Sequence, residues 1–267
     1  MKLNFKVIFF YFFLFSNLIA VEFKGKFEQG SYIIGKTNKN SKVKIDDRTV
    51  RVSKEGFFAF GLDRDRKNDV IIKITEKNET KIITKKILKR KYNVQKIDGL
   101  PSKQVTPPPE VYEQIKKDNL SISKARSIDT DYNFFKEKFI YPIDKYIITG
   151  VYGSQRILNG KPRRPHYGID FHAPEGTPVK AMMDGEVTLS ENDMYFTGGT
   201  IIFDHGHGVS TLYMHMKNIN VKVGQKVKRG EIVGTLGQSG RATGPHLDIR
   251  LNWFDVKLDP KSILEKN

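Results

Sequence analysis

Residues 199–216 read GTIIFDHGHGVSTLYMHM, two apolar stretches on either side of a turn rich in glycine. Isoleucine, phenylalanine, valine, threonine and tyrosine, which favour strands, fill both stretches. The segment therefore predicts a β-hairpin. His205 and His207 fall in its turn, and we interpret them as turn residues rather than as a metal-binding pair.

The same pattern extends to both sides of this hairpin. We expect strands at residues 146–150, 178–182, 185–190, 199–204, 209–216, 231–236 and 246–251. Glycines separate almost all of them, which is typical of a compact antiparallel barrel or sandwich and not of an α/β domain. Residues 138–267 are therefore predicted to form an antiparallel β domain.

The N-terminal part of the chain is also predicted to be β, so the fold class is all-β. Strands are expected at residues 22–27, 31–35, 42–46, 49–53, 57–61, 69–76 and 81–88. Short alternating strands with turn residues between them predict a small β-sandwich over residues 21–96. This segment has no histidine, and we assign it to binding or spacing.

Residues 97–137 differ in character from the two β segments. Proline at positions 101 and 107–109 predicts an extended, semi-rigid linker, and a helix is expected from about residue 110 to 125. Val111 and Ile115 give this helix an apolar stripe, which we expect to dock on a neighbouring domain.

Residues 1–20 are predicted to be a secretory signal peptide. Lys2 and Lys6 precede the apolar run 7–15, and small residues follow at 16–20. The run is shorter than the about 20 residues that cross a bilayer, so no stable membrane span is expected, although an uncleaved signal would act as an anchor. The absence of cysteine excludes lipoprotein attachment and thiol catalysis.

The chain carries a net charge of +16, of which +10 lies in residues 21–100. Such a surface favours a polyanionic partner. For an exported protein the available polyanions are cell-wall polymers and lipid head groups, so we expect no nucleic-acid partner. A solvated lysine-rich face without any partner is the alternative.

All six histidines lie between residues 166 and 246, which indicates a metal site. His166 and Asp170 are four residues apart, and a straight strand would hold them about 13 Å apart, too far to share an ion. Gly168 permits the bend that would bring them together.

Two further segments carry ligand-type residues. His246 and Asp248 alternate on one face of an expected strand, about 7 Å apart, and His215 follows Tyr213 on another strand. Catalytic zinc sites use three nitrogen or oxygen ligands and leave one position for water. The histidines that do not bind the metal would then be available to transfer protons.

These segments, His166-x-x-x-Asp170, Tyr-x-His215 and Gly-Pro-His246-x-Asp248, occur in the order found in the lysostaphin-type zinc endopeptidases of peptidoglycan, also called LytM-like domains. The resemblance covers roughly residues 138–262. It implies that His166, Asp170 and Asp248 bind one Zn²⁺ per chain and that His215 and His246 are catalytic.

The sequence departs from the family pattern at one position. The family commonly ends its third motif with histidine, whereas this chain has Asp248. Aspartate is a competent zinc ligand, so the resemblance still implies an active site. Two carboxylates neutralise a dication, so a metal-activated water should be less acidic than in the usual site.

The resemblance implies an exported zinc metalloendopeptidase that hydrolyses peptide bonds in the stem or cross-bridge peptides of peptidoglycan. It would act in the periplasm or elsewhere in the bacterial cell envelope. The alternative is a catalytically inactive LytM-like protein that binds the wall and activates another cell-wall hydrolase, which would then be its partner. Which peptide bond is cleaved stays open.

Overall fold

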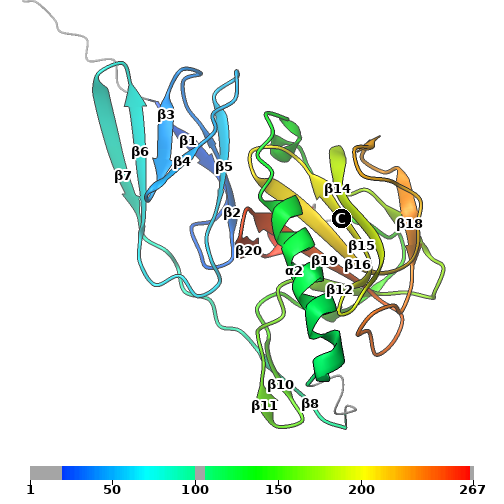
Figure 1. Ribbon diagram of the computed structural model, residues 1–267. Coiled ribbons are helices and arrows are strands. Elements are labelled where there is room, and N and C mark those ends of the chain that lie inside the picture. Colours follow the sequence, from blue (N-terminus) through cyan, green and yellow to red (C-terminus); the bar gives the residue numbers. More distant parts are fainter. Residues whose placement is uncertain (1–19, 100–105, 265–267) are drawn as a thin grey trace, which may run out of the picture.

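The computed structural model of the chain describes residues 20–99 and 106–264, which form two β regions side by side and one long helix (Figure 1). The predicted signal segment falls almost wholly outside the described residues. Within the described ranges, no helix has the length and apolar character needed to cross a membrane.

The N-terminal region is a small sandwich of two antiparallel sheets, which confirms the predicted fold of this segment. The first sheet has the order β1 (Glu22–Lys24), β2 (Tyr32–Lys36), β5 (Phe57–Gly61), and the second has the order β4 (Arg48–Val50), β3 (Lys42–Ile45), β6 (Val70–Glu76), β7 (Glu79–Lys85). Val43 and Ile45 alternate with exposed lysines along β3, so one face of that strand is buried in the sandwich core.

The C-terminal region is one large, curved sheet whose neighbouring strands are all antiparallel. Its main path is β17 (Lys226–Val227), β14 (Gly185–Met194), β15 (Gly198–Asp204), β16 (Val209–Ile219), β19 (Leu247–Trp253), β12 (Ile169–His172), β9 (Ile147–Gly150). β13 (Pro178–Lys180) pairs with β18 (Ile232–Leu236), β18 also pairs with β16, and β20 (Val256–Leu258) pairs with β19. The predicted hairpin over residues 199–216 is confirmed as β15 and β16.

The two β regions share part of their hydrophobic core. Phe58 and Phe60 of β5 belong to the same buried cluster as Leu251 of β19 and Leu258 of β20. The Tyr32 hydroxyl donates a hydrogen bond of 2.9 Å to the carbonyl oxygen of Phe135, in a 3₁₀ turn at Phe134–Lys136. The sandwich is therefore packed against the larger sheet and not merely tethered to it.

A third, smaller sheet joins distant parts of the chain at one end of the large sheet. β8 (Val94–Ile97) pairs in parallel with β10 (Gln155–Leu158), which forms a hairpin with β11 (Lys161–Pro162). Residues just after the sandwich thus contact the segment that leads into β12.

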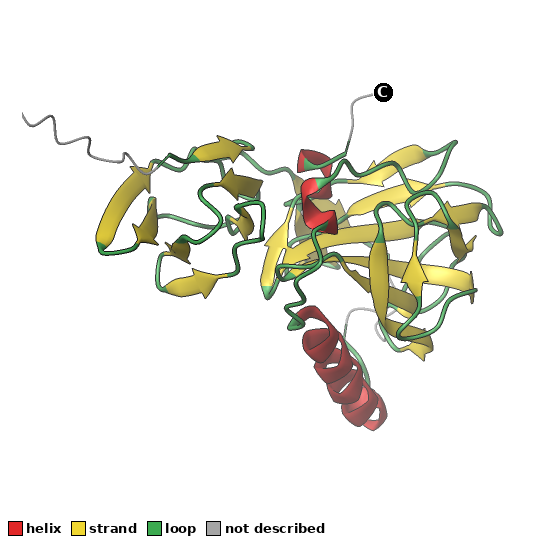
Figure 2. Ribbon diagram, turned by 90° about the horizontal axis from the view of Figure 1, so that it is seen from above, coloured by secondary structure: helices red, strands yellow, loops and turns green. Residues whose placement is uncertain are grey.

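The helix expected at residues 110–125 is confirmed as a 3₁₀ turn at Pro109–Val111 followed by α2 (Tyr112–Arg126). Its inner face carries Ile122 and Ala125, which pack against a buried cluster on the outside of the large sheet: Leu189, Met194, Ile202, Leu212 and Met214. The helix docks on a neighbouring sheet, as expected, but it does so through Ile122 and Ala125, and the predicted stripe residues Val111 and Ile115 do not belong to this cluster. α2 lies along the outer surface of the large sheet (Figure 2). A last 3₁₀ turn, Pro260–Ser262, follows β20.

Candidate active site

The pairing of β12 with β19 brings two carboxylates together. Asp170 of β12 lies directly opposite Asp248 of β19 in the antiparallel register. Side chains of directly opposed residues point to the same face of a sheet. Both aspartates are buried, at 7% and 3% exposure.

His166 completes this group from the loop that precedes β12. Its Nε2 atom lies 3.0 Å from Asp170 Oδ1 and 3.3 Å from Asp248 Oδ2. Because β12 begins only at Ile169, the chain bends between the histidine and Asp170, at the place where Gly168 was expected to permit it. The structure therefore brings together the three residues for which the sequence predicts metal binding.

Two glycines make room for these carboxylates. A Cβ atom at Gly168 would overlap Asp248 Oδ1, and a Cβ atom at Gly150 would overlap Asp170 Oδ2. Neither position needs a left-handed backbone, so the requirement for glycine here is one of space.

The electrostatics of the group favour a cation. Burial opposes ionisation of Asp248, but Arg250 and His166 outweigh it and hold the pKa of Asp248 well below its usual value. Burial alone would lower the pKa of His166, yet the neighbouring Asp248 and Asp170 carboxylates raise it to about 9.

The three residues fit a divalent metal ion. One ligand atom from each of His166, Asp170 and Asp248 lies within 4.8 Å of the others, and no other such group occurs among the residues that the structure describes. Asp248 Oδ1 is buried and accepts no hydrogen bond, which is costly for a carboxylate oxygen unless a cation binds it. One imidazole nitrogen and two carboxylate oxygens form a donor set that Zn²⁺ accepts.

His215 is held beside this group by an unusual backbone conformation. It lies in β16 with φ of 64°, a left-handed value that costs a non-glycine residue roughly 1–2 kcal/mol. Its Nδ1 lies 2.8 Å from the carbonyl oxygen of Ser239 and donates to it, which leaves Nε2 as a proton acceptor. Burial first, and then the nearby His246, lower the pKa of His215 to about 4, so this imidazole is neutral at pH 7.

His246 lies next to His215, immediately before β19. The two ring centroids are 4.6 Å apart. His246 Nδ1 lies 2.9 Å from the carbonyl oxygen of Gly244 and donates to it. Both predicted catalytic histidines therefore keep Nε2 available for a substrate.

The other three histidines lie outside this arrangement. His205 is buried, with Nδ1 2.8 Å from the Asp184 carbonyl oxygen and Nε2 2.8 Å from Thr211 Oγ1. His207 Nδ1 lies 3.1 Å from the carbonyl oxygen of Arg51. Both lie in the turn between β15 and β16, as predicted. His172 is exposed and donates to the Pro245 carbonyl oxygen at 2.7 Å.

Sequence reasoning missed two arginines that contact the carboxylates. Arg156 Nη2 lies 3.2 Å from Asp170 Oδ2, and Arg250 Nη2 lies 3.0 Å from Asp248 Oδ2. Alternation along β19 would have found Arg250, because it lies two residues after Asp248 and on the same face. No local signal identifies Arg156, which comes from β10 in another sheet.

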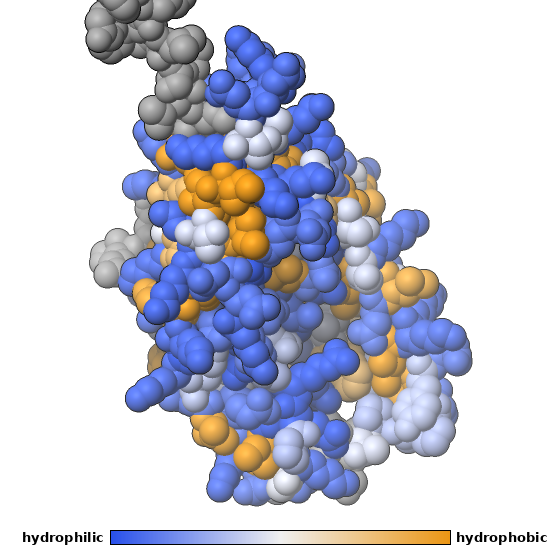
Figure 3. Space-filling view, turned by 90° about the vertical axis from the view of Figure 1, so that its left-hand side faces the viewer, coloured by the Kyte–Doolittle hydropathy of each residue, from blue (hydrophilic) through white to orange (hydrophobic). Residues whose placement is uncertain are grey.

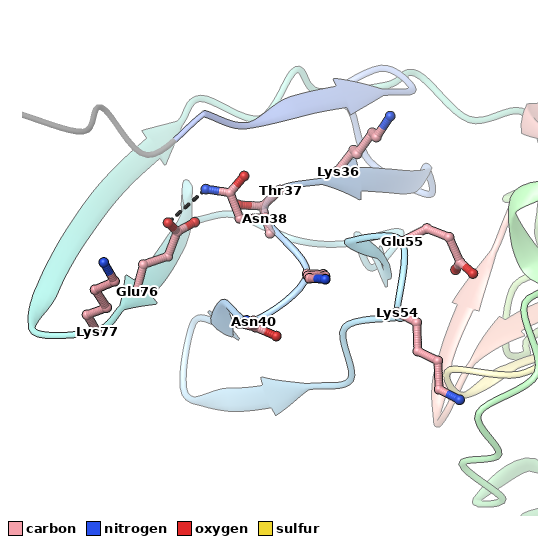
Figure 4. A pocket seen from close by; sticks show the side chains of 9 residues that line it. Lys36, Thr37, Asn38, Asn40, Lys54, Glu55, Glu76 and Lys77 are labelled. Atoms are coloured by element: carbon pink, nitrogen blue, oxygen red, sulfur yellow. Dashed lines mark hydrogen bonds between the residues drawn. The ribbon is translucent and has the colours of Figure 1, made fainter.

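A separate hollow of about 700 Å³ lies in the N-terminal sandwich (Figure 4). Its lining contains four lysines and two glutamates but no histidine: Lys36, Thr37, Asn38, Lys39, Asn40, Lys54, Glu55, Glu76 and Lys77. Glu76 accepts a hydrogen bond of 2.8 Å from Asn38. The hollow shares no residue with the five-residue site.

Residues 164–260 match the model of peptidase family M23. The chain is 42% identical over 113 residues to the peptidoglycan DD-endopeptidase ShyA of Vibrio cholerae, covering 42% of this chain and 26% of ShyA. It is 36% identical over 140 residues to the DD-carboxypeptidase/endopeptidase Mpg of Neisseria meningitidis, covering 51% of this chain and 32% of Mpg. The chain thus matches a third or less of the length of these curated relatives.

The fold as a whole has a counterpart among solved structures. A putative peptidase M23 from Pseudomonas aeruginosa superposes with a TM-score of 0.68 at 23% identity, covering 89% of this chain and 95% of that one. The likeness therefore includes the N-terminal region as well as the large sheet.

Proposed function

Because this chain contains a domain of peptidase family M23, the lysostaphin-type or LytM-like family, we propose that it is an exported zinc metalloendopeptidase that hydrolyses peptide bonds of peptidoglycan. One observation carries the proposal. His215 and His246 lie beside a buried group of one imidazole and two carboxylates that fits a divalent metal.

His166, Asp170 and Asp248 would hold the metal. A bound Zn²⁺ supplies Lewis acidity, which polarises a carbonyl group and lowers the pKa of a water molecule. Arg156 and Arg250 orient the two carboxylates through the ion pairs at 3.2 Å and 3.0 Å.

His215 and His246 handle the protons of the reaction. Water adds to the carbonyl carbon of the scissile bond, the carbon–nitrogen bond breaks, and the proton lost by the water is delivered to the leaving amine. A neutral imidazole can accept this proton at Nε2 and return it. The second imidazole, once protonated, would donate a hydrogen bond to the developing oxyanion.

The N-terminal sandwich suits wall binding. Lys42, Lys44 and Lys73 share the outer face of its four-stranded sheet, where Lys44 and Lys73 are direct cross-strand neighbours. Like charges placed in this way repel each other unless an anion lies nearby. Figure 3 looks at this end of the molecule, which is largely hydrophilic with a compact apolar patch. We propose that the lysine-bearing face of the sandwich binds the anionic polymers of the cell wall.

Release of peptide fragments from purified peptidoglycan tests the proposal. The zinc-loaded chain should release fragments, and His215→Ala or His246→Ala should reduce release by about a hundredfold or more while the zinc content stays near one per chain. Val223→Ala serves as the control, because this side chain is exposed and has no assigned role. Full fragment release by both variants would contradict the proposal.

The second candidate function, an inactive activator of another wall hydrolase, has a different outcome in the same assay. If the protein were such an activator, the wild type alone would release no peptide fragments from peptidoglycan. The His215→Ala and His246→Ala variants would still stimulate a partner enzyme. The retention of both histidines and of a complete ligand group favours the peptidase.

A further inference from the structure

His215 lies at a β-bulge, where the regular ladder of hydrogen bonds does not fix its position. The register of β15 and β16 shifts between Gly199 and Ile201, so β16 carries one residue more than β15 over this stretch. A bulge leaves the extra residue without its regular partner and re-aims a side chain. His215 falls in this stretch with its left-handed φ of 64°. Its place beside the metal group therefore depends on contacts outside the ladder.

The backbone of His215 is held by the loop between β14 and β15. The backbone nitrogen of His215 donates a hydrogen bond of 2.8 Å to the carbonyl oxygen of Thr197 in this loop. Ser239, which accepts from the Nδ1 atom of His215, also accepts from the Gly199 nitrogen at 2.9 Å through its Oγ atom. The imidazole and the loop are thus tied to the same neighbours, and a displaced loop would move the imidazole.

Helix α2 holds the other end of the same loop. The backbone nitrogen of Tyr195 donates a hydrogen bond of 2.8 Å to Oδ2 of Asp118, in the middle of the helix. One turn earlier, Gln114 Nε2 donates to the Asp193 carbonyl oxygen at 3.2 Å. A carboxylate accepts a hydrogen bond more strongly than a neutral carbonyl group does, so Asp118 gives the firmer attachment.

The loop transmits this attachment because it is short and tightly packed. Only Phe196 separates Tyr195 from Thr197. Thr200 Oγ1 lies 2.7 Å from Thr197 Oγ1, and a Cβ atom at the next residue, Gly198, would overlap Ser239. Closely packed groups move together rather than deform one by one. The position of Asp118 therefore bears on the position of the histidine across the loop.

We propose that Asp118 is a positioning residue for His215. It fixes the loop at Tyr195, and the loop fixes the backbone of the histidine through Thr197. Asp118 acts through the loop rather than on the reacting atoms. Because α2 lies outside residues 164–260, which match family M23, the inference makes the linker helix part of the working site. It rests on the proposed peptidase function and adds to it a residue that tunes proton transfer.

Steady-state kinetics of Asp118→Ala test the effect on the reaction. The probe is a mixture of soluble cross-linked peptides prepared from peptidoglycan, and the enzyme is the zinc-loaded full-length protein. The value of kcat should fall about tenfold while KM stays within about twofold, because a misplaced imidazole weakens the transition state and not substrate binding. Asp118→Asn keeps a side-chain oxygen as acceptor and should restore kcat to within about threefold of the wild type.

Amide hydrogen exchange followed by NMR tests the route without any substrate. Asp118→Ala should speed exchange at Tyr195 and His215 about tenfold or more, because the loop opens locally once its acceptor is gone. Exchange at Thr211, farther along β16, should stay within about twofold. Glu113→Ala is the matched control. It removes a carboxylate of the same helix whose side chain is 89% exposed, and it should change neither exchange nor kcat.

The two measurements separate the positioning role from the peptidase function. Unchanged exchange at His215 in Asp118→Ala, or an unchanged kcat where the wild type cleaves, would overturn the positioning role. Exchange that rises equally at Thr211 would indicate general destabilisation and would overturn it as well. If the wild type cleaves no peptide, exchange alone decides. Faster exchange confined to Tyr195 and His215 would then support the positioning role while the peptidase function fails.

Discussion

Asp248 is the residue on which the metal site depends most. Its carboxylate is shared between His166 and Arg250, at 3.3 Å and 3.0 Å, and its second oxygen has no hydrogen bond. A metal ion would satisfy that oxygen. An aspartate without a metal would leave it buried and unsatisfied.

Asp248→Ala should therefore lose zinc and hydrolytic activity together. Zinc affinity should fall by more than about a hundredfold, beyond the usual effect of changing a residue that only supports a ligand. Asp248→His should retain zinc and should weaken Mn²⁺ relative to Zn²⁺, because imidazole is the softer ligand. Metal analysis after dialysis against Zn²⁺ or Mn²⁺ measures the metal content of both variants. Full zinc content in Asp248→Ala would exclude this residue as a ligand.

His205 is predicted to make the fold sensitive to acid. Burial lowers its pKa to about 4, whereas an unfolded histidine titrates near 6.5. Above pH 6.5 the residue is neutral in both states and its contribution to stability is complete. Between pH 6.5 and 4 the unfolded state binds the proton first, so the free energy of unfolding should fall by about 3 kcal/mol.

The pH dependence of urea unfolding tests this expectation. His205→Gln should reduce the loss of stability between pH 6.5 and 4, even if it lowers stability at pH 7.5. His207 and His215, whose pKa values burial also lowers to about 4, should keep their share of the loss. Val223→Ala, at an exposed side chain that does not titrate, should leave the slope unchanged. An unchanged slope in His205→Gln would show that other groups cause the acid sensitivity.

At the scale of elements, the site depends on how closely its strands approach one another. β12 and β19 place the two aspartates opposite each other, and Gly150 in β9 and Gly168 before β12 give the carboxylates room. The glycines do not touch a metal, but they decide whether two bulky ionised groups fit between neighbouring strands.

Gly168→Ala should lower zinc affinity without unfolding the protein. Its methyl group would overlap both Asp248 Oδ1 and the backbone oxygen of Ile249, so the carboxylate cannot keep its position. Gly244→Ala is the matched control in the loop before β19, because a Cβ atom there meets nothing within 4 Å. Zinc titration followed by competition with a chelator compares the two variants. Equal affinities would contradict the crowding argument.

At the scale of the whole molecule, the two β regions are expected to unfold together. Val209, Trp253 and Leu258 of the large sheet share a buried cluster with the sandwich strand β5. Arg90 of the N-terminal half also pairs with the buried Asp259 at 2.9 Å. Separation of the regions would expose this apolar surface to water.

Leu258→Ala should destabilise the entire chain by about 2–5 kcal/mol, the usual cost of truncating a buried leucine. Calorimetry should show a single transition that shifts as a whole. Val223→Ala, at a side chain with 62% exposure, should change stability by less than about 0.5 kcal/mol. Two transitions, of which the substitution moves only one, would show that the regions fold independently.

The residue pattern by itself determined the β character of both regions and the helix, and the resemblance of three motifs to a known family supplied the candidate site residues. Alternation in β3 and the glycine-flanked hairpin of β15 and β16 predicted strands, because each residue's own polarity reports which face of a strand is buried. The spacing of His166 and Asp170 also required a bend, which the structure contains before Ile169.

Only the tertiary structure decided which residues meet across strands. The sequence does not specify that Asp170 pairs with Asp248, that β8 joins β10, or that Arg156 reaches Asp170. The left-handed conformation of His215 is equally invisible in its sequence. Strand order and register follow from the packing of the whole core, whereas a local pattern records only the burial of each element's own faces.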